Sequence, residues 1–189
     1  MTDFFNKTDL SRNDAEKIIS ETLNNCDDGE LYLENSKSES IVLDDDKIKS
    51  STYSSDLGYG LRAVTGEVVA YSHSNEISRN SLKQSADNLS STLKSRKGVY
   101  NHEIPKTNEK FYKNINPIEE KSLQSKLELL KEVNNYTRAK GGTVQQVTAS
   151  FSGEHKSIEI FVISLEIFIN SSNFFILCSF LFISKINQN

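Results

Sequence analysis

The sequence contains no tryptophan, one methionine, two prolines and two cysteines in 189 residues. Cys26 and Cys178 lie far apart and lack the short spacing of a metal site. They predict reduced thiols in a cytosolic protein rather than a disulfide framework. The amino terminus has no basic stretch followed by an apolar core, which argues against a signal peptide. We therefore expect a cytoplasmic protein.

Blocks of positive charge are also missing. The chain has 22 lysine and arginine residues against 26 aspartate and glutamate residues, for a net charge of −4, and the two signs are interspersed. This balance does not favour a nucleic-acid partner. The length allows one domain with room for an appendage.

Motifs for catalysis are absent as well. The histidines are His73, His102 and His155, with no ligand spacing between them, so we interpret each as a surface residue. Neither a G-x-G-x-x-G loop nor a G-x-S-x-G elbow occurs. The acidic triplet 44–46 is adjacent in sequence, which favours a solvated turn over a metal site. The residues therefore predict no catalytic or metal-binding side chain.

The apolar periodicity predicts helices and strands in one α+β domain. Ser11 and Asp14 indicate a helix start, and helical spacing recurs over residues 76–97, with Ser74 as a cap, and again from Asn116 to the glycines at 141–142. Alternation predicts strands at residues 31–33, 40–43, 47–53, 56–72, 143–152 and 156–163, with a turn at Gly153. We expect a mostly antiparallel sheet with helices packed on one face.

The hairpin at residues 56–72 is the most informative stretch. Two apolar runs flank a tight turn that we place at Thr65 and Gly66. Gly58 and Gly60 lie inside the first strand, where glycine costs backbone entropy and packs nothing. They predict a bulge or the close approach of another backbone.

This hairpin carries a family resemblance. Its G-x-G-x-R-A-x-x-G-E block and the following strand resemble the amino-terminal part of the TldD/PmbA metallopeptidases, on the TldD side. The residues that carry the likeness are Gly58, Gly60, Arg62, Ala63, Gly66, Glu67, Tyr71 and Ser72. A second, supporting block runs over residues 144–153, so the resemblance covers roughly the first 157 residues.

The resemblance implies a cytosolic zinc enzyme in full-length members, which cleaves small unfolded peptides and pairs with a related TldD/PmbA-type subunit. Antitoxin and peptide-antibiotic processing belong to the family's record. Its zinc motif is His-Glu-x-x-x-His, with a cysteine further along, and this sequence contains no such motif. We therefore expect no cofactor and no peptidase activity in this chain.

The composition changes after about Ile158. Residues 158–189 hold six of the ten phenylalanines but only one basic residue, Lys185. The longest apolar run, residues 174–183, is about half the ~20 residues that a membrane helix needs, so we expect no membrane span. We predict a TldD/PmbA-like domain at 1–157 and a divergent hydrophobic tail at 158–189, consistent with a lost reading frame or a broken gene.

Two functions follow for this chain. The first is the non-catalytic amino-terminal part of a TldD-like zinc metallopeptidase. The second is a stand-alone module that binds a peptide or partner along a sheet edge. For either, Gly58, Gly60 and Arg62 are the predicted contact residues, although a salt bridge to a neighbouring acid is the favoured explanation of Arg62.

Overall fold

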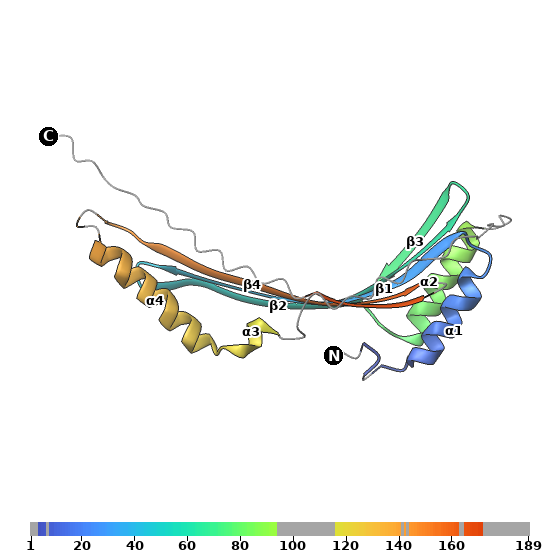
Figure 1. The fold of residues 1–189 in the computed structure, drawn as a ribbon, viewed down its shortest axis with the longest axis horizontal. Coiled ribbons are helices and arrows are strands. Elements are labelled where there is room, and N and C mark those ends of the chain that lie inside the picture. Colours follow the sequence, from blue (N-terminus) through green and yellow to red (C-terminus); the bar gives the residue numbers. More distant parts are fainter. Residues whose placement is uncertain are drawn as a thin grey trace. The chain divides into compact units, whose positions relative to one another are not determined.

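The computed structural model describes residues 4–6, 8–93, 116–140, 142 and 144–162, and the backbone of a strand at 165–171. Within these ranges the protein is α+β, with helices packed against an antiparallel sheet, as the sequence predicts. The five strands lie in the order β3-β2-β1-β4-β5, and Figure 1 labels the first four strands of the chain. Their bounds are Asp28–Asp44 for β1, Lys47–Thr65 for β2, Val68–Ser74 for β3, Thr148–Val162 for β4 and Leu165–Ser171 for β5.

The strands β1 and β2 are longer than the sequence predicts. The short strands expected at 31–33 and 40–43 are parts of the single strand β1, and β2 joins residues 47–53 to the hairpin. The polar residues between them do not break a strand, because a paired strand can hold half-buried or ion-paired polar side chains, as it does at Glu39, which pairs with Lys126. Gly153 likewise makes no turn, since β4 runs straight through it with alternating burial.

The β2–β3 hairpin is present with a shifted turn. Thr65 pairs with Val68, so the loop is Gly66–Glu67 rather than Thr65–Gly66. Gly66 has a positive φ of 61°, the left-handed conformation that glycine adopts without steric cost. Its backbone N–H donates to Asp27 Oδ2 at 2.6 Å, which ties the loop to the start of β1.

The chain forms two compact units, each with its own core. The first unit comprises Met1–Asn35, Asp56–Asn114 and Lys156–Ser171. Its helices are α1 (Arg12–Leu23) and α2 (Arg79–Thr92), which pack on each other, with α2 also against β3. The core side chains from these helices and the sheet include Ala15, Ile19, Leu23, Leu31, Leu33, Leu61, Ala63, Leu82, Leu89 and Phe161.

Both helix starts of the first unit have serine caps. Ser11 accepts from the Asp14 N–H at 3.1 Å, as the sequence predicts. The predicted cap Ser74 is wrong, because Ser74 still belongs to β3 and Ser78 accepts from the Ser81 N–H at 3.2 Å. A serine side chain at the cap satisfies one of the unpaired N–H groups of the first turn.

The second unit comprises Ser36–Ser55, Ile115–His155 and Ser172–Asn189. Its described helices are the short α3 (Pro117–Glu120) and α4 (Leu123–Lys140). Asn116 caps α3 as predicted, but the single helix expected to run on to residue 141 is interrupted at Lys121, whose backbone is extended. The core is formed by Ile41, Leu43, Leu130, Ala149 and Phe151.

The predicted tail is described only in part. Phe161 is buried in the core of the first unit, and β5 pairs with β4 from Val162↔Leu165 to Lys156↔Ser171. Residues 172–189 lie outside the described part of the chain, so the predicted boundary at 157 stays a prediction. In the described ranges, no helix has the length and apolar character needed to cross a bilayer.

Candidate functional site

The three predicted contact residues share the outward face of β2, opposite the helices. Alternation along the strand buries Tyr59 and Leu61 beneath the sheet and turns Gly58, Gly60 and Arg62 the other way. The structure therefore places these three residues together on one surface of the first unit. Whether this surface contacts a peptide or a partner stays a prediction.

Arg62 forms two ion pairs with β1. Its Nη2 lies 2.5 Å from Asp28 Oδ2, and its Nε lies 3.1 Å from Glu30 Oε1. The salt bridge considered from the sequence is thus confirmed, with two acids instead of one. The guanidinium fork uses separate N–H groups for the two carboxylates, which lysine could not reproduce.

The two glycines are explained by close neighbours on β3. A Cβ on Gly58 would lie 2.8 Å from the carbonyl oxygen of Ser74, and a Cβ on Gly60 would lie 2.5 Å from the Tyr71 hydroxyl. The backbone approach predicted from the sequence is therefore made at Gly58 by the chain itself. At Gly60 an aromatic ring from the neighbouring strand takes the space.

An open trough of about 270 Å³ lies over these glycines, and we call it the glycine trough. Tyr32 and Glu34 of β1 line it, and the Tyr32 hydroxyl donates to Glu34 Oε2 at 2.5 Å. Burial, together with the Glu34 charge, raises the pKa of Tyr32. The phenol therefore keeps its proton and acts as a donor to the carboxylate.

The opposite wall of the trough comes from the edge strand β3. The rings of Tyr71 and His73 are stacked, with centroids 5.8 Å apart and planes 27° apart. Both side chains also line the trough, and Tyr71 is 63% exposed. Asp56 and Leu57 contribute at the end nearest Gly58. The arrangement offers aromatic faces and carboxylates, which suit a cation rather than an anion.

The sequence predicted Gly58 and Gly60 as contact residues, but it did not predict the side chains of β1 and β3 that form the two walls of the trough. Tyr32 and Glu34 alternate with the buried Leu31 and Leu33, so their outward direction could be predicted. Their distance from Tyr71 could not, because it depends on the β1–β2 and β2–β3 registers.

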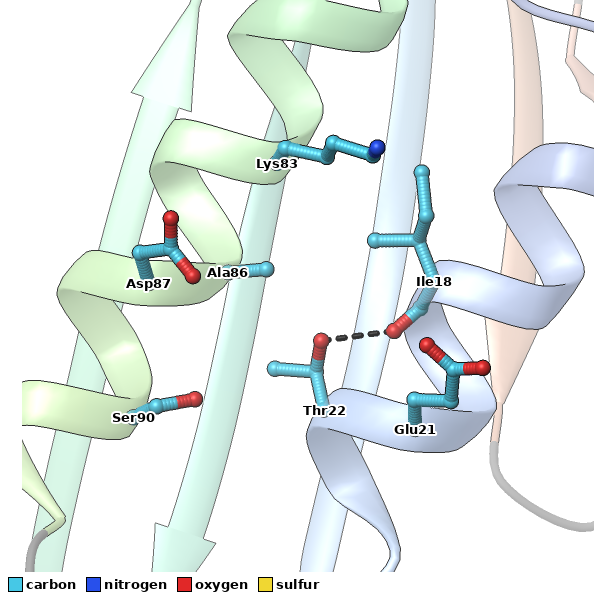
Figure 2. Close-up of a pocket in the computed structure, with 7 residues that line it drawn as sticks. All are labelled: Ile18, Glu21, Thr22, Lys83, Ala86, Asp87 and Ser90. Atoms are coloured by element: carbon cyan, nitrogen blue, oxygen red, sulfur yellow. Dashed lines mark hydrogen bonds between the residues drawn. The ribbon is translucent and has the colours of Figure 1, made fainter.

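A second cavity, of about 310 Å³, lies between α1 and α2 in the same unit (Figure 2). It is lined by Lys83 and Asp87 of α2 and by Glu21 and Thr22 of α1, and the Thr22 hydroxyl donates to the Ile18 carbonyl at 2.6 Å. One cation and two carboxylates border the space. This mixture gives no preference for a ligand of either charge.

The histidines do not form a ligand set in the described residues. His73 is exposed on β3, His155 is buried on β4, and His102 lies outside the described ranges. The interpretation of His155 as a surface residue is therefore wrong, since a 15-residue strand carries it to the covered face. Burial lowers the pKa of His155, and the positive charge of Lys37 lowers it further. The negative charge of Glu119 acts in the opposite direction and raises the pKa.

Other candidate ligands are also engaged elsewhere. Asp44 accepts from Gln146 and Thr148 at 2.9 Å each, while Asp45 accepts from the Val147 N–H at 3.0 Å. The acidic turn therefore anchors β1 and β2 to the start of β4. Throughout the ranges that the structure describes, no three histidine, cysteine or acidic side chains gather as a metal site. These residues do not fit a zinc ion.

Comparison with known proteins places these features in a wider context. A model of "PmbA/TldA metallopeptidase domain 1" matches residues 29–93. The chain is similar to a "Metalloprotease TldD homolog" of Buchnera aphidicola from Acyrthosiphon pisum, with 35% identity over 133 residues. That match covers 70% of this chain and 28% of the relative. A TldD homologue of Haemophilus influenzae is 32% identical over 142 residues, which are 72% of this chain and 29% of that protein.

Solved structures share the fold. A protein from Bacteroides thetaiotaomicron described as a modulator of DNA gyrase aligns with a TM-score of 0.60 and 18% identity, over 82% of this chain and 37% of that one. TldE from Thermococcus kodakarensis aligns with a TM-score of 0.56 and 15% identity, over 82% of this chain and 36% of that one. The present chain thus spans less than a third of the curated relatives and little more than a third of these structures.

Proposed function

Because this chain carries the first domain of the TldD/PmbA metallopeptidase family, we propose that it acts as the non-catalytic amino-terminal part of a TldD-like metallopeptidase. The match of residues 29–93 to the family's first domain carries this proposal. The sequence resemblance implies zinc-dependent cleavage of small unfolded peptides by full-length members. A zinc ion would supply an activated water in such an enzyme.

The sequence supports the proposed inactivity of the isolated chain. A catalytic zinc site needs three protein ligands and an open position, and the family motif that supplies them, His-Glu-x-x-x-His, does not occur among the 189 residues. The role left to these residues is structural. In the part of the chain that the structure describes, α1 and α2 pack on one face of the sheet, and the edge strand β3 is short.

A peptide-cleavage assay tests this role. The purified chain and a full-length TldD homologue, such as the Haemophilus protein, would be incubated with an unfolded peptide mixture with and without a zinc chelator. We expect chelator-sensitive cleavage by the full-length relative and none by the chain. Cleavage by the chain that the chelator abolishes would contradict the proposal.

A related subunit is the proposed partner, and the cytoplasm the proposed compartment. The fold shared with TldE supports a related subunit as the partner, and the net charge of −4 disfavours a nucleic-acid partner. Co-expression of the chain with a tagged TldD/PmbA-type subunit, followed by size-exclusion chromatography, tests it. Co-elution at a defined ratio is expected, and separate elution would remove this partner.

The second candidate is a stand-alone peptide-binding module. β3 lies at the end of the described strand order and exposes Val69 and Tyr71, at 59% and 63%. An edge strand can accept an extended peptide through main-chain hydrogen bonds, and Gly58, Gly60 and Arg62 lie beside it on the outward face. Binding of extended peptides that Val69→Pro abolishes, with folding intact, would favour this module.

A further inference from the structure

We propose that the glycine trough binds an arginine side chain presented by an extended peptide. The inference deepens the peptide-contacting role given above to Gly58 and Gly60, and it rests on that role. It assigns a chemical class to the occupant, namely a planar cation.

The shape of the trough fits a long side chain. Gly58 and Gly60 contribute no side chains to its floor, and the Tyr71 ring lies over Gly60, so the open space lies beside that ring. Its volume of about 270 Å³ is far more than one water requires, since a water's share of liquid volume is about 30 Å³. A side chain can therefore lie in the space between the Tyr71 ring and the Tyr32 and Glu34 side chains of β1.

Charge selects a cation. Glu34 lies on the β1 side of the trough, where its carboxylate accepts a hydrogen bond from the Tyr32 hydroxyl. Lys156 Nζ lies 3.7 Å from Glu34 Oε1, a distance longer than that of a close ion pair. Asp56 lies at the mouth and is exposed, and among the described residues it makes no ion pair. These two carboxylates give the trough acceptors on two strands.

The aromatic wall selects arginine over lysine. The Tyr71 and His73 rings are stacked on β3, and a planar guanidinium can lie against a ring face that the stack leaves uncovered. The fork of N–H groups can reach carboxylates on different strands at once, whereas an ammonium is a single point of charge. Arginine also carries less tightly held water, so moving it into a half-open trough costs less than moving lysine.

Titration of the full chain with capped pentapeptides tests the proposal. The peptides differ only at the central residue, which is arginine, lysine or citrulline, the uncharged isostere. We expect arginine to bind about tenfold more tightly than citrulline, which corresponds to about 1.4 kcal/mol. Lysine should fall between them, and added salt should reduce the difference.

Variants locate the binding. Asp56→Asn and Glu34→Gln should each weaken arginine binding by roughly two- to fivefold, the range for an ion pair in a solvated site. Asp87→Asn on α2 is the matched control, because it removes the same charge from an exposed position outside the trough and should change nothing. Circular dichroism checks that each variant folds.

Three outcomes would overturn the inference. They are no binding of the arginine peptide at millimolar concentration, equal binding of citrulline, and equal weakening by Asp87→Asn and Asp56→Asn. Equal binding of citrulline with the Val69→Pro effect retained would leave the peptide-contacting role standing and remove only the arginine preference. The non-catalytic role is tested separately by the cleavage assay.

Discussion

At the residue scale, Gly58 and Gly60 differ in what an added methyl group would meet. The methyl of Gly58→Ala would press on the Ser74 carbonyl, which is backbone, whereas that of Gly60→Ala meets the end of the Tyr71 side chain, which can swing away. We expect Gly58→Ala to cost about 1–3 kcal/mol and Gly60→Ala below about 1 kcal/mol. Urea unfolding measures both, and equal costs would contradict this reading of the β2–β3 contact.

His155 makes the stability of the second unit depend on pH. Burial lowers its pKa first and Lys37 adds to the effect, so the folded state binds fewer protons than the unfolded state near the ordinary histidine pKa of 6.5. The stabilisation is present above that pKa and is lost as pH falls through the lowered folded value. We expect the free energy of unfolding to decrease between pH 7 and pH 5.

The matched variants are His155→Gln and His73→Gln, of which the second changes an exposed histidine on β3. The first should flatten the slope of unfolding free energy against pH, and the second should leave the slope as in the parent chain. The same slope in the parent and in His155→Gln would show that another group carries the pH dependence.

At the element scale, Lys126 links α4 to β1 and α3. Its Nζ pairs with Glu39 of β1 and donates to the Ile118 carbonyl of α3 at 2.6 Å, and its side chain is only 6% exposed. Lys126→Met would leave Glu39 buried without its partner, which typically costs about 3–5 kcal/mol. The double variant Lys126→Met/Glu39→Gln should recover part of this loss in urea unfolding.

The control for this prediction is Lys37→Met. Lys37 pairs with Glu119 at 2.6 Å, but Glu119 is 57% exposed, so water can replace the lost partner. A surface pair of this kind contributes about 0–1 kcal/mol. A loss for Lys37→Met as large as that for Lys126→Met would contradict the assignment of Lys126 as the main link.

Most of the elements could be predicted from the sequence, but their ends could not. Apolar spacing located α1, α2, α4 and the β2–β3 hairpin. The break between α3 and α4 was missed because Ser122, which accepts from the Ser125 N–H at 3.2 Å, starts a new helix within an unbroken apolar period. Strand lengths were missed because a polar stretch reads as a loop unless its pairing partner is known.

The same limit applies to the candidate site. Gly58, Gly60 and Arg62 stood out because their residue types are unusual at those strand positions. The sequence indicated that Arg62 could pair with an acid, but it could not identify Asp28 and Glu30 as the partners. The strand that places them beside Arg62 is more than 30 residues away in sequence. Long-range register decides such contacts, and periodicity does not encode it.

At the scale of the whole molecule, the position of the carboxy-terminal boundary can be tested by two shortened chains. Phe161 is 4% exposed in the core of the first unit, and Glu159 pairs with Arg12 at 2.6 Å. A chain ending at Ser157 loses both side chains, and the loss of one buried phenylalanine alone costs about 3–5 kcal/mol. A chain ending at Ser171 retains them.

We expect the chain ending at Ser171 to keep the unfolding midpoint of the full chain and the chain ending at Ser157 to unfold at markedly lower urea. The chain ending at Ser171 should also self-associate less than the full chain, as measured by light scattering, because it lacks residues 172–189, which are rich in phenylalanine and isoleucine. Equal midpoints for the two shortened chains would place the structural boundary at 157.

The central claim is that these residues form a non-catalytic part of a metallopeptidase. The most direct test is the zinc content of the purified chain after dialysis against zinc and then against metal-free buffer, by mass spectrometry of the metal. The account predicts zinc far below one ion per chain, with a full-length TldD homologue retaining it. One tightly held zinc per chain, together with peptide cleavage, would contradict the account.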